Sequence, residues 1–252
     1  MQKMLAFTEK EKTYDGTNGV VFDSPGDSRR LGFYFPFGWI EYTTKETHRG
    51  QTNLVDAVPN EKQALKLTMS ILSQVGIKTS DLDKNETNGK PHFRYYSGET
   101  IYFLNHTFIT NLYERAVRFR RAVDGFTFIG ADAGGQGMIT FGEHGEITKM
   151  DLYWRNLKRF KVYATATPET ITDWIRNGKA VENGIPMNEL PIDWNTVKSV
   201  TVKKADIIYY GGMPGSPSDW LIPLASLWAT VERGNGATID LEIDCPVYQE
   251  TP

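Results

Sequence analysis

The 252-residue chain has a single cysteine, Cys245, which excludes an internal disulfide framework and any cysteine-rich zinc or iron–sulfur site. It also lacks an excess of basic residues, because 28 Lys and Arg are outnumbered by 31 Asp and Glu, for a net charge of −3. Nucleic-acid-binding proteins carry a basic patch and usually a high isoelectric point. We therefore expect no nucleic-acid partner.

Long hydrophobic runs are absent as well. A membrane-spanning helix needs about 20 consecutive apolar residues, and one of the longest apolar stretches here, 220–229, is interrupted by Pro223 and Ser226. The amino-terminal sequence MQKMLAFTEKEKTYDG contains no apolar run of signal-peptide length. We expect no membrane span, and a cytoplasmic location unless a leader precedes the mature chain, in which case the location is extracytoplasmic.

The chain also lacks metal and nucleotide motifs. The four histidines, His48, His92, His106 and His144, form no H-x-H or H-x-x-x-H pair, so no zinc-ligand spacing is present. The glycine-rich segment 130–137 lacks the Gly-Lys-Ser/Thr ending of a phosphate loop, and a connection between strands or a β-bulge explains it more simply. The sequence therefore predicts a protein that uses neither a metal nor a cofactor.

The residues that are present are typical of a folded globular protein, with 40% hydrophobic and 23% charged side chains. The first 58 residues surround one aromatic block, LGFYFPFGWI at 31–40, which has the composition of a strand. However, Pro36, Gly32 and Gly38 disfavour the interior of a sheet. We interpret residues 1–58 as an extended amino-terminal arm that contributes an edge strand.

A helix is predicted over residues 61–75. Asn60 can act as its N-cap with Gln63 as the capping-box partner, and Gly76 ends it. Residues suited to a buried stripe recur at helical spacing, namely Ala64, Leu65, Thr68, Ile71, Leu72 and Val75.

A second helix is predicted over residues 168–177. Thr167 is a suitable N-cap, and Pro168 fits the first helical position. Its short apolar stripe consists of Ile171, Trp174 and Ile175.

Runs of aromatic and β-branched residues follow each helix. They occupy 100–105, 113–123, 126–130, 138–142 and 146–155 after the first helix, and 197–210, 221–232 and 237–247 after the second. Helices that are segregated from antiparallel strands indicate an α+β fold. We expect two helix-on-antiparallel-sheet units, residues 59–160 and 161–252, after the arm 1–58.

Several segments resemble the PepSY-like and YycI/YycH-like superfamily. They are RRAVDGFTFIG at 120–130, ITFGEHGEI at 139–147, Trp154-Arg155, ADIIYYG at 205–211 and WLIP at 220–223. The resemblance covers about residues 60–247. It implies two cystatin-like units, each a helix wrapped by a curved antiparallel sheet, in an extracytoplasmic binding or inhibitory protein. It provides no catalytic motif.

We expect a binding protein whose ligand, a small molecule or a protein partner, lies in a groove between the two lobes. Arg118 and Arg120 share one face of the strand 113–123, and Arg115, Arg121 and Arg155 join them in a basic stripe. The stripe either pairs with an acidic strand or lines an anion-binding groove. Trp154, Arg155 and Tyr210 complete the predicted binding set, because strand faces that no helix covers are free to bind.

The alternative is a cofactor-independent enzyme, an acid–base lyase, isomerase or cyclase that uses a concave sheet as its active-site cavity. Its candidate catalytic residues are His106, Glu114 and Asp124, since imidazole and carboxylate groups transfer protons without a metal. A raised carboxyl pKa would be its signature. A structural or assembly subunit is a third interpretation, because exposed strand edges pair with other chains.

The last predicted strand has two different faces. Asp240, Glu242 and Asp244 alternate along one face, and Cys245 falls on the apolar side. We interpret the carboxylates as a solvated face rather than a calcium site, because a calcium site usually needs a loop that surrounds the ion with oxygens. Cys245 is predicted to be a buried, unreactive thiol, since reactive thiols lie in exposed electropositive surroundings.

Overall fold

The computed structural model describes residues 11–13, 19–24, 28–35, 38–44, 57–104, 106–129, 135–159, 164–176, 180–182, 185–186, 194–213 and 216–249. The chain divides into two compact units. Unit 1 comprises residues 1–156 and 211–218, and unit 2 comprises residues 157–210 and 219–252. Within the described ranges, no helix has both the length and the apolar character needed to cross a membrane.

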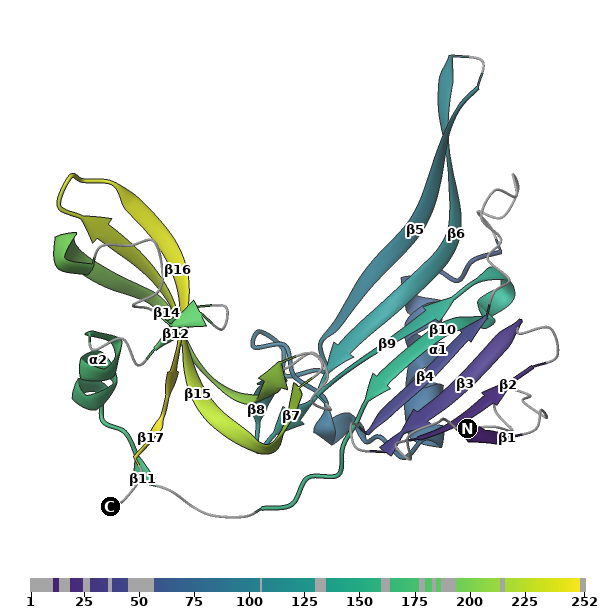
Figure 1. The fold of residues 1–252 in the computed structure, drawn as a ribbon. Helices are drawn as coiled ribbons and strands as arrows, with labels where there is room; N and C mark the ends of the chain where they lie inside the picture. Colours follow the sequence, from purple (N-terminus) through teal and green to yellow (C-terminus); the bar gives the residue numbers. More distant parts are fainter. Residues whose placement is uncertain are drawn as a thin grey trace. The chain divides into compact units, whose positions relative to one another are not determined.

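Unit 1 is built on an eight-stranded antiparallel sheet (Figure 1). Its strands are β1 (Glu11–Thr13), β2 (Gly19–Asp23), β3 (Arg29–Tyr34), β4 (Trp39–Thr44), β5 (Phe93–Leu104), β6 (Thr107–Arg120), β9 (Gln136–Phe141) and β10 (Ile147–Tyr153). They lie in the order β1-β2-β3-β4-β10-β9-β6-β5, and every pair of neighbours is antiparallel. Shorter elements of the unit are η3 (Thr79–Asp81), β7 (Ala122–Val123), β8 (Phe126–Ile129) and η4 (Glu143–Gly145).

Helix α1 (Glu61–Gln74) begins with the predicted capping box. The backbone N–H of Gln63 donates to Asn60 Oδ1 at 3.0 Å, and the backbone N–H of Asn60 donates to Gln63 Oε1 at 2.9 Å. The helix is followed by Gly76, whose φ of +81° is a left-handed conformation that glycine adopts without strain. The helix predicted over 61–75 is therefore confirmed.

The core of unit 1 lies between α1 and one face of the sheet. The helix buries Ala64, Thr68, Ile71 and Leu72. The strands contribute alternate residues to the same core, namely Leu31, Tyr42, Val117, Phe119, Ile139, Phe141, Met150 and Leu152. Strand residues between these positions point away from α1, so the sheet has a helix-covered face and a helix-free face.

The predicted edge position of the aromatic block is wrong. Strand β3 lies between β2 and β4, with Leu31 opposite both Phe22 and Tyr42. Of the two glycines, Gly32 lies within β3, whereas Gly38 lies between β3 and β4. Gly38 forms the turn before β4 with φ of +56°, and Gly32 leaves room for the Tyr34 ring, which would lie 2.7 Å from a Cβ atom at that position.

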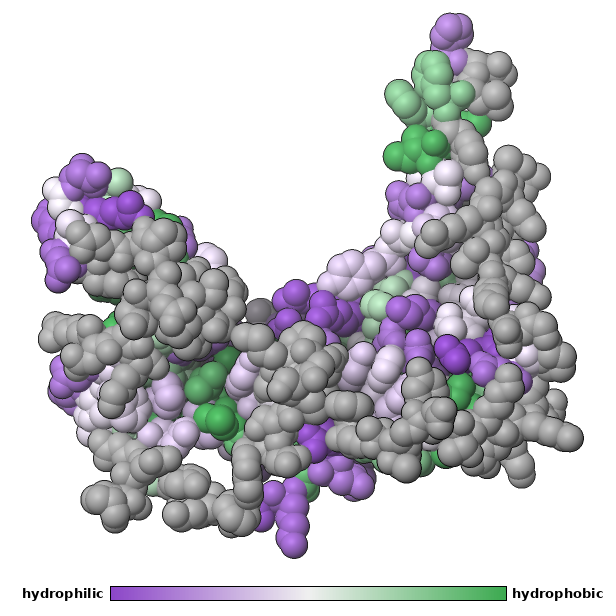
Figure 2. All heavy atoms as spheres, viewed as in Figure 1, coloured by the Kyte–Doolittle hydropathy of each residue, from purple (hydrophilic) through white to green (hydrophobic). Residues whose placement is uncertain are grey.

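The hairpin of β5 and β6 extends beyond the rest of the eight-stranded sheet (Figure 1). A register shift between Gly98 and Glu99 separates its base from its outer part. The outer part exposes Ile101, Phe103, Phe108 and Ile109, and Figure 2 shows this hydrophobic cluster near the tip. These side chains lie outside the core of unit 1.

Unit 2 contains α2 (Pro168–Arg176) and several strands: β11 (Ala164–Thr165), β12 (Val181–Glu182), β13 (Ile185–Pro186), β14 (Val197–Met213), β15 (Ser216–Arg233), β16 (Thr238–Pro246) and β17 (Tyr248–Gln249). A 3-10 turn, η6 (Trp194–Thr196), precedes β14. Strands β11 and β17 form a two-stranded sheet, and a seven-stranded sheet has the order β13-β12-β16-β15-β14-β8-β7. The ends of β14 and β15, residues 211–218, group with unit 1, which also contains β7 and β8.

The second predicted helix is confirmed as α2, and its stripe of Ile171, Trp174 and Ile175 packs on the apolar face of β15 and β16. Cys245 lies on that face and is fully buried. Burial raises the pKa of its thiol to about 11, so the thiol stays protonated at neutral pH, as predicted for an unreactive cysteine. On the opposite face, Asp240 accepts hydrogen bonds from Lys203 and Thr230.

The predicted fold class, α+β with two cystatin-like helix-on-sheet units, is wrong. The two described α-helices span only 14 and 9 residues, whereas the sheets have eight, seven and two strands, so the fold is dominated by β-structure. Half of the eight-stranded sheet comes from β1 to β4, which precede α1. A local pattern of residues does not reveal which strands pair. The sequence-based prediction therefore built the first sheet only from the strands that follow the helix.

Candidate anion-binding site

Three arginines gather on the helix-free face of unit 1. The register of the hairpin places Arg94 of β5 directly opposite Arg118 of β6, and Arg120 lies two residues further along β6 on the same face. All three line a small pocket of about 40 Å³ together with Asp83, His92 and Phe119. We call Arg94, Arg118 and Arg120 the arginine cluster.

Little negative charge compensates the arginine cluster. Among the described residues, none of the three guanidinium groups forms an ion pair with a carboxylate. Asp83 is the one carboxylate in the described lining of the pocket, and it accepts a hydrogen bond from the Thr127 hydroxyl at 2.8 Å. Like charges directly opposite each other on paired strands are destabilising, so the cluster costs the fold free energy.

The surroundings of Arg120 reflect this crowding of positive charge. Burial lowers the pKa of the Arg120 guanidinium, and the charges of Arg118 and Arg94 lower it further. The opposing charge of Asp83 raises it. Arg120 remains a cation at neutral pH because the ordinary pKa of arginine is far above 7.

A row of stacked aromatic rings lies beside the arginine cluster on the same face. Cross-strand pairing runs from Arg120 through Gln136 and Tyr153 to Trp39 and Tyr34. The rings of Tyr34 and Trp39 stack at 4.3 Å, and those of Trp39 and Tyr153 stack at 5.4 Å. At the boundary, Arg118 Nη2 donates to Gln136 Oε1 at 2.7 Å, which fixes the guanidinium beside the pocket.

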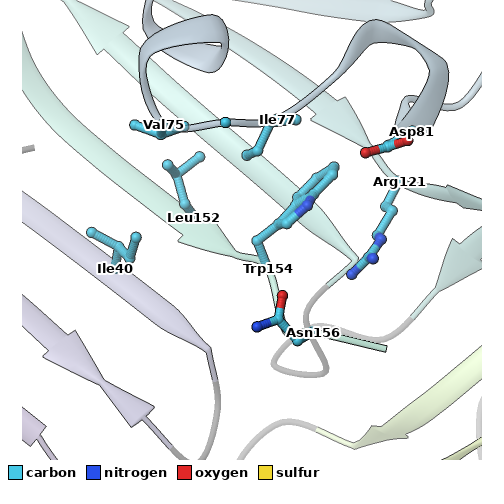
Figure 3. Close-up of a pocket in the computed structure, with 9 residues that line it drawn as sticks. Ile40, Val75, Ile77, Asp81, Arg121, Leu152, Trp154 and Asn156 are labelled. Atoms are coloured by element: carbon cyan, nitrogen blue, oxygen red, sulfur yellow. The ribbon is translucent and has the colours of Figure 1, made fainter. Parts of the chain in front are cut away.

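A larger pocket of about 280 Å³ lies on the helix-covered side of unit 1 (Figure 3). Its apolar wall consists of Ile40, Val75, Ile77, Leu152 and Trp154, and its polar residues are Asp81, Arg121 and Asn156. The guanidinium carbon of Arg121 lies 5.1 Å from the centre of the Trp154 ring.

The structure brings together only part of the predicted binding set. Arg118 and Arg120 are neighbours in the arginine cluster, whereas Trp154 lies in the larger pocket on the other side of the sheet. The backbone carbonyl of Arg155 accepts a hydrogen bond from Arg121. Tyr210 belongs to β14 in unit 2, where burial and the charge of Asp244 raise its pKa.

The three candidate catalytic residues lie on different elements of unit 1. His106 occupies the exposed turn between β5 and β6, and Asp124 occupies the exposed turn between β7 and β8. Glu114 lies eight residues along β6 from His106, a separation of roughly 25 Å at 3.3 Å per extended residue. His106 and Glu114 therefore cannot act on the same atom of a substrate.

The part of the chain that the structure describes contains no group of three or more His, Cys, Asp or Glu side chains that could hold a metal ion. Residues 130–134 of the glycine-rich segment lie outside the described residues.

Sequence reasoning missed Arg94 and the stacked aromatic row as parts of binding surfaces, and it grouped Arg121 with Arg118 and Arg120. Arg94 precedes the strand predicted at 100–105, so its place opposite Arg118 depends on a longer β5 and on the register of the hairpin. Tyr34, Trp39 and Tyr153 come from three strands. Only the order of strands in the sheet brings them together, and no local pattern encodes that order.

Comparison with known proteins adds little to this description. No family model and no curated protein matches the chain. The chain is similar to the crystal structure of an uncharacterized protein from Eubacterium rectale ATCC 33656, with 10% sequence identity and a TM-score of 0.48. The match covers 97% of this chain and 75% of that one, and such a distant likeness supports no conclusion about function.

Proposed function

We propose that this protein is a binding protein whose arginine cluster captures an oxyanion, such as a phosphate or sulfate group on a larger ligand. The observation that supports this most directly is the meeting of Arg94, Arg118 and Arg120 around one pocket with a single carboxylate in its described lining. Guanidinium groups present fixed pairs of N–H donors that match the oxygens of such anions.

The charge balance supports an anion rather than a neutral ligand. The protein as a whole carries a net charge of −3, so three arginines beside one aspartate are not a consequence of overall composition. An incoming anion would offset the repulsion between Arg94 and Arg118, which face each other across the strands. Binding would thus recover part of the free energy that the cluster costs the unliganded fold.

The size of the pocket indicates which part of the ligand it takes. A volume of about 40 Å³ is far below the roughly 300–1,000 Å³ of sites that enclose drug-sized ligands, so the body of an organic ligand does not fit. The anionic group alone would enter the pocket, while the rest of the ligand extends over the neighbouring surface. The stacked rings of Tyr34, Trp39 and Tyr153 offer an aromatic surface next to it.

Binding of inorganic pyrophosphate, measured by isothermal titration calorimetry at low ionic strength, tests this proposal. Arg118→Gln and Arg120→Gln should each weaken binding by about 10- to 100-fold, because each removes a charge-assisted hydrogen-bond donor while keeping a polar side chain. Added salt should weaken binding to the unaltered protein through screening of the charges.

Arg30→Gln is the matched control, because Arg30 also lies on the helix-free face but is paired with Asp23 at 3.2 Å. It should leave the pyrophosphate affinity unchanged. The proposal is wrong if pyrophosphate does not bind the unaltered protein, or if Arg30→Gln weakens binding as much as the two cluster variants do.

A further inference from the structure

The larger pocket on the helix-covered side of unit 1 has the chemistry of a second, separate binding site. Its apolar wall contains the buried side chains of Ile77 and Leu152 and the indole of Trp154 (Figure 3). A volume of about 280 Å³ is near the lower end of the range for small-molecule sites. The pocket is therefore suited to a compact apolar group.

Arg121 supplies the positive charge in the lining of this pocket. Its backbone is held in place, because its N–H donates to the Gly135 carbonyl and its own carbonyl accepts from Phe128. One Nη1 hydrogen bond goes to the Arg155 carbonyl, and this is the only hydrogen bond that the guanidinium makes with the described residues. Since a guanidinium has five N–H donors, most remain available to an acceptor on a ligand.

The surroundings of Arg121 strengthen the hydrogen bonds that its guanidinium can donate. Arg121 is about half-buried and lies over the Trp154 ring, and its burial lowers the pKa of the guanidinium, which is still charged at neutral pH. A hydrogen bond to a partly desolvated cation is stronger than one in open water.

We propose that this pocket binds a small monocarboxylate with an apolar body, whose carboxylate pairs with Arg121 and whose body lies against Ile77, Leu152 and Trp154. Asp81 lines the same pocket and would repel a second negative charge, so a monocarboxylate fits better than a phosphate group. The site lies on the opposite side of the sheet from the arginine cluster and does not depend on the proposed oxyanion binding.

Three six-carbon probes, hexanoate, hexan-1-ol and hexylamine, separate the contributions of charge and apolar contact. Binding can be followed by the NMR signal of the Trp154 indole N–H, assigned with Trp154→Phe. Hexanoate should shift this signal saturably and bind about 10- to 100-fold more tightly than hexan-1-ol, while hexylamine should bind most weakly. Arg121→Gln should remove the preference for hexanoate over hexan-1-ol.

Val75→Phe provides a second variant that leaves Arg121 in place. Val75 is a half-buried residue of the pocket wall, so a larger ring should fill the space and weaken both hexanoate and hexan-1-ol. Arg120→Gln is the matched control, since it should weaken pyrophosphate binding on the other face by about 10- to 100-fold and leave hexanoate binding intact. The inference is overturned if hexanoate gives no saturable shift, binds no better than hexan-1-ol, or keeps its affinity in Val75→Phe.

Discussion

Replacing Phe119 with alanine should lower the free energy of unfolding by about 3 to 5 kcal/mol, the range found when a buried aromatic side chain is removed from a core. Phe119 is 1% exposed and belongs to the core of unit 1. Its ring contacts Phe93 and Trp154, with centroids 6.2 and 6.3 Å away. A Cβ atom on Gly137 would overlap the ring, so glycine at that position leaves room for the ring against β9.

Urea denaturation followed by circular dichroism measures this loss. Phe108→Ala is the matched control, because the Phe108 ring is 74% exposed on the outer part of the β5–β6 hairpin. Its removal should change the free energy of unfolding by less than about 0.5 kcal/mol. Equal losses in the two variants would contradict the position of the core between α1 and the sheet.

Leu31→Ala should destabilise the protein by about 2 to 5 kcal/mol. Leu31 is 0% exposed at the middle of β3 and belongs to the same core as Phe119. An amino-terminal arm laid on the surface would lose far less. This variant therefore distinguishes an integral amino-terminal half-sheet from the extended arm that the sequence suggested.

Phe35→Ala serves as the control for Leu31→Ala in the same denaturation experiment. Phe35 lies just after β3 and is 67% exposed, so its truncation should cost less than about 0.5 kcal/mol. If Leu31→Ala costs no more than Phe35→Ala, strands β2 to β4 do not form part of the core.

The local elements of the fold could be predicted from the sequence because their signals are local. The capping box of Asn60 and Gln63 needs only four consecutive residues, and it marks the start of α1. The alternation of Leu241, Ile243 and Cys245 with acidic residues likewise identifies β16 and its buried face.

The arrangement of the sheets could not be predicted, because it depends on pairing between distant segments. β4 pairs with β10, although more than 90 residues separate Thr44 from Ile147. Nothing in the residues of β4 specifies that partner. Gly32 and Gly38 both predict an interruption of the strand, but Gly32 lies within β3 against the Tyr34 ring and Gly38 alone lies in a turn. Without this information, the sequence pattern predicts two helix-on-sheet units in place of a fold dominated by sheets.

The candidate sites likewise contain features that the sequence predicts and features that depend on strand pairing. That Arg118 and Arg120 share a face follows from their spacing of two residues on one strand. That Arg94 joins them, and that Trp154 points instead to the helix-covered side with Arg121, follows from hairpin register and from the parity of β10. The sequence pattern places Arg118, Arg120 and Arg121 in one stripe with Trp154, whereas the structure separates Arg121 and Trp154 from the other two.

The most direct test of the proposed function is to locate a bound oxyanion. Crystals of the protein soaked in tungstate, a phosphate-like anion with strong anomalous scattering, should show an anomalous peak within hydrogen-bonding distance of the Arg118 and Arg120 guanidinium groups. Crystals of Arg120→Gln soaked in the same way should lose that peak. A peak that persists in Arg120→Gln, or tungstate bound only away from the arginine cluster, would contradict the proposal.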